Sequence, residues 1–223
     1  MSTTLTITVS GLKPFEGTIS LPPAEGVAPA LVVIHEWWGI TDHVRSLVDR
    51  FAAEGLVVLA PDLYDGQVAK NADEAEVLMN GLDWPLAIRK VSAATDLLRA
   101  HPRSTGKVGV TGFCMGGALA FRAACEVAHL GAVVPFYGLP GDVDWARVTA
   151  PIMAHFAVHD DWAKASSAEA IKAQLARMGK EMALHVYDAS HAFMNDTRPD
   201  VYNAEVAKLA WSRTVKFLKS HLS

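Results

Sequence analysis

The feature that most constrains this chain is a glycine-rich turn between an apolar run and an alanine-rich segment. The turn reads Gly112-Phe113-Cys114-Met115-Gly116-Gly117, and it lies between residues 107–111 and 118–128. This order predicts a strand, a sharp turn and a helix, with a thiol at the tip of the turn. Side chains at Gly112 and Gly116 would collide as the helix folds back over the strand, which explains the glycines.

Cys114 lies where the predicted helix begins, and this position indicates a nucleophile. The macrodipole and the free N–H groups of a helix N-terminus favour a thiolate. A G-x-C-x-G turn between strand and helix is typical of the nucleophile elbow of an α/β-hydrolase, with cysteine in the usual place of serine. A free cysteine is more often a small core residue. The glycine-flanked turn favours the catalytic interpretation for Cys114, whereas Cys125, in mid-helix, is expected in the core.

Apolar runs alternate with segments of helical periodicity along the rest of the chain. Strands are predicted at residues 3–9, 15–20, 30–35, 56–60, 107–112, 131–137, 151–158 and 182–187. Helices are predicted at residues 44–54, 72–80, 85–100, 115–128, 165–178 and 199–220. This alternation predicts an α/β-hydrolase fold, in which helices cover both faces of a mostly parallel central sheet. One such domain is expected to span residues 1–223.

Composition narrows the function classes. The chain has 223 residues, 51% of them apolar, with a net charge of -4 and a pI near 6.1, which gives no reason to expect binding to nucleic acid or to an anionic membrane. No apolar run approaches the roughly 20 residues of a spanning helix. The two cysteines do not suggest a disulfide framework, and residues 1–5 lack the features of a signal peptide. We expect a cytoplasmic protein that is a monomer rather than an obligate oligomer and acts on a small molecule.

Acidic residues and a histidine follow the predicted strands on either side of the turn. Glu36 follows the strand at 30–35, the pair Asp160-Asp161 follows the strand at 151–158, and His191 follows the strand at 182–187. Ligands of open α/β sheets bind outside the carboxyl ends of the strands. The order nucleophile, acid, histidine is the one expected for this fold. From the residues alone, Asp160 and Asp161 are nearly even candidates for the acid.

Each candidate has a catalytic role and a plainer alternative. His191 would transfer protons, although the chain has nine histidines and a loop histidine is often only a surface residue. Asp160 would orient its imidazole. Glu36 would place a carboxylate near the thiol, or would only be an exposed or helix-capping acid. The backbone N–H groups of Met115 and Trp37 would form an oxyanion hole.

Aromatic side chains around these residues are candidate walls of a substrate pocket, with ordinary core or rim positions as an equal alternative. The candidates are Trp38, Tyr64, Trp162 and Phe193. The stretch His35-Glu36-Trp37-Trp38 is not an H-E-x-x-H motif, and no other grouping has zinc-ligand spacing. No metal and no cofactor are expected.

Across nearly its whole length the chain resembles the dienelactone hydrolase family (carboxymethylenebutenolidases). The resemblance lies in residues 33–39, 60–64, 106–117, 135–138, 159–162 and 190–193. It implies a triad of Cys114, His191 and Asp160, and thereby selects Asp160 over Asp161. It also implies that Glu36 lies beside a neutral resting thiol and becomes its base when substrate binds.

Departures from the family pattern concern the substrate. The resemblance implies two arginines that hold a substrate carboxylate, but Met194-Asn195 occupies the stretch after the histidine, and Arg198 is the nearest arginine. Residues 65–88 contain no arginine, and Ala192 replaces a small hydroxyl residue. A carboxylate without a partner binds poorly in an aromatic pocket. We therefore expect no anion clamp and a less acidic or uncharged ester or lactone.

The leading interpretation is a hydrolase that cleaves an ester or lactone through a cysteinyl acyl-enzyme. A non-catalytic α/β-hydrolase-fold protein that binds a small ligand is the alternative from another class. A thiol-based redox protein would need a resolving cysteine, and Cys125 is poorly placed for that role. An acyltransferase with an acceptor other than water stays open.

Overall fold

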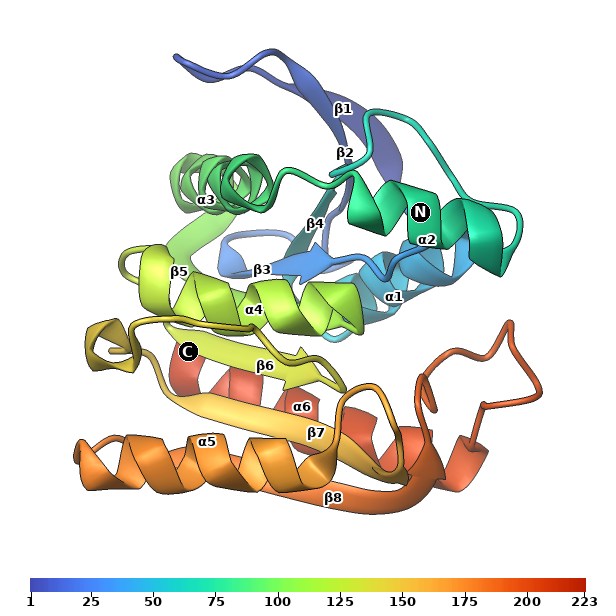
Figure 1. Ribbon diagram of the computed structural model, residues 1–223. Coiled ribbons are helices and arrows are strands. Elements are labelled where there is room, and N and C mark those ends of the chain that lie inside the picture. The colour runs from blue at the N-terminus through green and yellow to red at the C-terminus, as the bar shows by residue number, and fades with distance from the viewer.

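The computed structural model describes residues 1–223, and its centre is one eight-stranded sheet in the order β1-β2-β4-β3-β5-β6-β7-β8 (Figure 1). The strands are β1 Thr3–Ile7, β2 Phe15–Ser20, β3 Ala28–Ile34, β4 Val57–Pro61, β5 Ser104–Phe113, β6 Ala132–Phe136, β7 Ile152–His159 and β8 Met182–Ser190. The helices are α1 Asp42–Ala53, α2 Ala72–Asn80, α3 Trp84–Ala100, α4 Met115–Glu126, α5 Ala165–Arg177 and α6 Ala204–Leu222.

The sheet is parallel from β4 to β8, and antiparallel pairing joins only β1 to β2 and β2 to β4. β4 and β6 are buried along their whole length. Strands buried on both faces have continuous apolar sequences, which is why these runs are recognisable in the sequence. The predicted α/β-hydrolase architecture is therefore confirmed.

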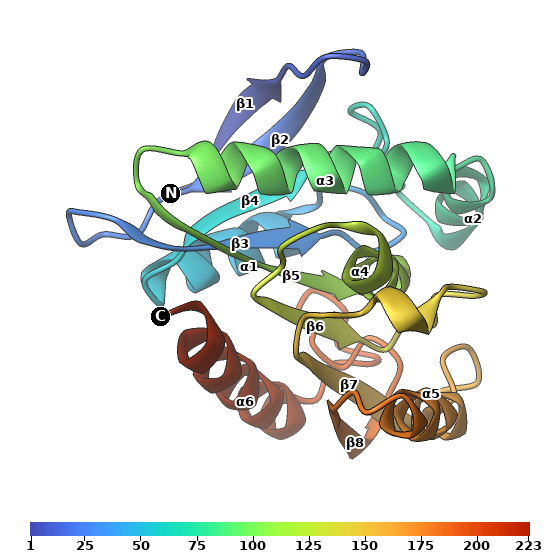
Figure 2. The same ribbon diagram turned by 90° about the vertical axis from the view of Figure 1, so that its left-hand side faces the viewer.

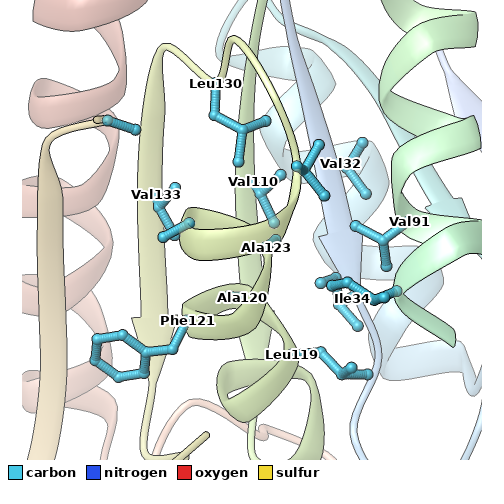
Figure 3. Packing of buried hydrophobic residues seen from close by; sticks show 14 of the residues in the cluster. Val32, Ile34, Val91, Val110, Leu119, Ala120, Phe121, Ala123, Leu130 and Val133 are labelled. Atoms are coloured by element: carbon cyan, nitrogen blue, oxygen red, sulfur yellow. The ribbon is translucent and has the colours of Figure 1, made fainter. Parts of the chain in front are cut away.

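Helices cover both faces of the sheet. Figure 2 shows α1 and α6 on one side of the strands and α3, α4 and α5 on the other. Each face has its own hydrophobic cluster, of 37 buried residues on the α3–α5 side and 27 on the other. Figure 3 shows Leu119, Ala120 and Ala123 of α4 among the valines of the central strands. Small side chains allow α4 to lie close to the sheet, which places its first turn at the end of β5.

The structure differs from the predicted elements mainly near the C-terminus. α6 begins at Ala204 instead of residue 199, because Asn203 caps it by accepting a hydrogen bond from the N–H of Val206. β8 continues to Ser190, and a short 3-10 helix, Trp145–Arg147, was not predicted. None of the helices is both long and apolar enough to cross a membrane.

Candidate active site

The turn after β5 places Cys114 in a conformation that few side chains adopt. Cys114 has a φ of 57°, lies at the N-cap of α4 and is 4% exposed. A Cβ atom on Gly112 would lie 2.0 Å from the carbonyl oxygen of Gly116, and a Cβ atom on Gly116 would lie 2.3 Å from that of Ile34. These contacts confirm that the turn requires both glycines.

The surroundings of the thiol keep it neutral at rest. Burial raises the pKa of Cys114 far above its usual range, and the charge of Glu36 raises it further. The N–H groups of Met115 and Trp37 donate to Sγ and oppose this shift. Both hydrogen bonds favour a thiolate, as the position at a helix N-terminus predicts, but desolvation outweighs them in the resting site.

His191 and Asp160 form a hydrogen-bonded pair. His191 Nδ1 lies 2.6 Å from Asp160 Oδ2, and the side chain of Asp160 is fully buried. The other carboxylate oxygen of Asp160 accepts hydrogen bonds from the N–H groups of Trp162 and Ala163. Burial alone would raise the pKa of Asp160, but these three hydrogen bonds outweigh it and lower that pKa. Asp161, the competing acid, is exposed.

Glu36 is buried beside the thiol and has one free oxygen. Its Oε2 accepts a hydrogen bond of 2.7 Å from Nδ2 of Asn195, and its Oε1 has no partner. Asn195 is held in turn by Thr197, whose N–H and hydroxyl both donate to Asn195 Oδ1. A neutral amide thus holds the carboxylate on one side and leaves the other side available.

Tyr137 completes the buried polar group behind the thiol. Its φ is 34°, and its ring meets that of His191 edge to face at 5.1 Å between centroids. Its hydroxyl is buried without a partner. Burial raises its pKa well above the usual value, and the nearby groups Glu36 and Cys114 add to that effect. The phenol is therefore a neutral, buried neighbour of the site.

One cavity of about 460 Å³ brings the four predicted catalytic residues together. Cys114, His191, Asp160 and Glu36 all line it. Of the predicted aromatic walls, Trp38 and Trp162 line it, and so does Trp37, whose ring contacts both.

Two predicted wall residues do not line this cavity. Phe193 is fully buried and packs edge to face against Tyr137 and Tyr187 in the core. Tyr64 is buried, and its hydroxyl donates to Sδ of Met115 at 3.1 Å. Both residues lie in the core behind the site. Their positions in the sequence are close to those of site residues, but they do not determine which way the two rings point.

Arg198, the arginine nearest to His191 in the sequence, lines the cavity, where no anion clamp was expected. Its backbone N–H donates to the carbonyl of Asn195, so the chain turns back toward the site. Its guanidinium lies 5.7 Å from the ring centre of Trp38 and forms an ion pair of 2.7 Å with Asp200. The cavity therefore has one cation at its wall, and that cation already has an acidic partner.

Sequence reasoning missed several residues of the site. Glu76 and Met79, both on α2, line the cavity, as does His159. Figure 1 shows α2 on the side where β3 and β6 end. No sequence signal places α2 over the site, whereas Asn195 could have been found from its place four residues after His191. No group of three or more histidine, cysteine or acidic side chains has the arrangement of a metal site.

Comparisons with known proteins concern the family and the fold of this chain. The profile of the dienelactone hydrolase family matches residues 15–222. Protein usf of Aquifex pyrophilus is 39% identical over 227 residues, which cover 96% of each chain. Carboxymethylenebutenolidase 1 of Cupriavidus pinatubonensis is 28% identical over 212 residues, 88% of each chain. The crystal structure of a dienelactone hydrolase-like promiscuous phosphotriesterase from metagenomic libraries has a TM-score of 0.87 at 24% identity, and covers 100% of this chain and 99% of its own. That structural match concerns the fold alone.

Proposed function

From the premise that this chain belongs to the dienelactone hydrolase family, and is thus a hydrolase of carboxylic esters or lactones, we propose that it acts through a cysteinyl acyl-enzyme. Cys114 is the nucleophile, His191 transfers protons and Asp160 orients His191. One observation carries this proposal: a single cavity joins the thiol, the His191–Asp160 pair and Glu36. A protein that only binds a ligand has no need of this complete set.

The acylation step follows from the positions of the polar atoms. The thiolate attacks the carbonyl carbon, and the negative charge that develops on oxygen is stabilised by the N–H groups of Met115 and Trp37. The carbon–oxygen bond of the ester then breaks. The proton that Glu36 took from the thiol passes through His191 to the leaving oxygen, which restores the Glu36 carboxylate. In the second half, water attacks the thioester, His191 Nε2 accepts its proton and returns it to the sulfur.

Glu36 supplies the base that the resting thiol lacks. Its Oε1 is buried without a partner. In the resting site the negative charge of Glu36 raises the pKa of Cys114, so the thiol keeps its proton. A substrate that displaces the carboxylate from Asn195 toward Sγ would allow it to take the thiol proton. Thiolate formation would then depend on substrate, which protects the cysteine between turnovers.

Replacing Glu36 with glutamine is expected to change thiol reactivity and turnover in opposite directions. The carboxylate raises the pKa of Cys114, so the neutral amide lowers that pKa and increases the thiolate fraction at a given pH. Resting Cys114 should then react several-fold faster with iodoacetamide at mildly alkaline pH. Ester turnover should fall, because no carboxylate receives the thiol proton.

Alkylation is followed by intact-protein mass, and turnover by release of p-nitrophenol. Glu76→Gln is the matched control for the alkylation rate, because Glu76 lines the same cavity but is not among the groups that shift the pKa of Cys114. Slower alkylation of Glu36→Gln than of the unchanged protein would contradict substrate gating and would make Glu36 a base for the resting thiol.

Asp160→Asn is expected to lower kcat by the order of 10² to 10⁴, because the amide no longer holds His191 in the tautomer that accepts a proton at Nε2. Asp161→Asn is the matched control, since Asp161 is the exposed neighbour of the same residue type. Both variants are compared by kcat on p-nitrophenyl acetate and by their thermal midpoints. Equal losses in the two variants would contradict the assignment of the acid.

We also propose that the substrate is less acidic than cis-dienelactone. Arg198 is the only arginine or lysine that lines the cavity, and Asp200 already pairs with it. Four carboxylates line the same space and oppose a further anion: Glu36, Glu76, Asp160 and Asp161. Turnover is measured on cis-dienelactone and on neutral esters side by side. A kcat/KM for cis-dienelactone far above that of every neutral ester would overturn this proposal.

A further inference from the structure

A second, smaller cavity lies against the nucleophile. Its volume is about 250 Å³, and 8 of its 9 lining residues are hydrophobic, the ninth being Gly138. Trp84, Met115, Ala118, Leu139 and Ala163 are among them. Charged groups are absent from this lining. The cavity therefore has the chemistry of a site for a hydrocarbon group.

Cys114 lies at the junction of the two cavities. The larger cavity and the smaller one share Met79, Cys114 and Trp162, and no other lining residue. The larger one contains His191 together with charged groups such as Glu76 and Arg198. A carbonyl group bonded to Sγ would thus border both the larger cavity, with its charged groups, and the smaller, wholly uncharged one.

The position of His191 decides which half of an ester enters which cavity. The leaving oxygen must lie within hydrogen-bond reach of the group that protonates it. His191 lines only the larger cavity, so the alcohol half must leave through that space. The carbonyl oxygen is directed to the N–H groups of Met115 and Trp37. The remaining substituent of the tetrahedral carbon, the acyl chain, then has the smaller cavity available to it.

We propose that the cavity lined by Met115, Ala118 and Leu139 is an acyl-binding pocket, and that the substrate class is open-chain esters of uncharged aliphatic acids longer than acetate. This inference rests on the proposed function, because it needs Cys114 as nucleophile and His191 as proton donor. Each methylene group that moves from water into the pocket raises kcat/KM by roughly three- to fourfold until the pocket is full.

Two matched ester series test the assignment on the unchanged protein. The first lengthens the acyl chain, as p-nitrophenyl acetate, butyrate and hexanoate. The second lengthens the alcohol, as ethyl, butyl and hexyl acetate. The expected result is a rise of about tenfold or more in kcat/KM from acetate to butyrate in the first series, and a nearly flat profile in the second. A flat first series, or a rise only in the second, would overturn the acyl pocket.

Leu139→Trp adds a variant that fills the pocket from its partly buried loop position. The hexanoate-to-acetate ratio of kcat/KM is expected to fall toward one in this variant. Val77→Trp is the control, because Val77 is exposed on α2 and lines neither cavity, and its ratio should equal that of the unchanged protein. An unchanged ratio in Leu139→Trp would overturn the proposal.

These outcomes are distinguishable from failure of the proposed function. Acetate hydrolysis that depends on Cys114, together with no preference for longer acyl chains, would leave the acyl-enzyme mechanism in place and reject only the pocket. Absence of any turnover that depends on Cys114 would reject both.

Discussion

Cys114→Ala is expected to abolish ester hydrolysis, with a loss in kcat of at least about 10³-fold. Alanine removes the only atom that can form the acyl-enzyme, while the oxyanion N–H groups and the His191–Asp160 pair remain in place. Activity that remains would come from binding and electrostatic stabilisation alone. The measurement is steady-state release of p-nitrophenol, together with mass spectrometry of the protein quenched during turnover, in which the unchanged protein gains the mass of one acyl group.

Cys125→Ala is the matched control for this experiment. Cys125 is the only other cysteine, it is free and buried, and it lies on the same helix. Its removal should leave both turnover and acylation intact, because it does not line the catalytic cavity. Full activity in Cys114→Ala, or acylation at another residue, would contradict the cysteinyl mechanism.

Gly116→Ala is expected to destabilise the fold by at least about 3 kcal/mol, through backbone overlap that no rotamer change relieves. The new Cβ atom would lie 2.3 Å from the carbonyl oxygen of Ile34 and 2.6 Å from that of His35. Both atoms belong to the backbone at the end of β3, so α4 would have to move away from the sheet. That movement would also displace the N–H of Met115 from Sγ.

The free energy of unfolding is measured by urea denaturation and compared with that of Gly81→Ala. Gly81 has a φ of -83°, and a Cβ atom there would meet its nearest neighbour at 3.3 Å. Alanine at this position should change stability by less than about 1 kcal/mol. Similar unfolding midpoints for the two variants would show that the elbow tolerates a side chain at residue 116, against the geometry.

Local sequence signals predicted the turn at Cys114 and the parallel strands well, because each signal describes a short-range constraint. A glycine two residues on either side of Cys114 is needed wherever a helix folds back over its strand at this distance. The apolar runs of the parallel strands are continuous because both faces are covered. The predicted start of α6 was wrong, since one side-chain hydrogen bond from Asn203 sets it.

The choice between the two neighbouring acids as the partner of His191 depended on longer-range information. From the residues alone, Asp160 and Asp161 were nearly even, and only the family resemblance selected one. In the structure Asp160 faces His191, and Asp161 faces solvent. Both residues follow the end of β7, so which of them faces inward depends on how the strand end meets the next loop.

The sequence by itself determined the elbow, the placement of Cys114, Asp160 and His191 after strands β5, β7 and β8, and the layered α/β architecture, because these follow from local sterics and from hydrophobic periodicity. The tertiary structure alone decided the amide partner of Glu36, the return of Arg198 to the cavity and the apolar space behind Cys114. Each of these depends on burial and on contacts between segments far apart in the chain, and residue type at a single position specifies neither.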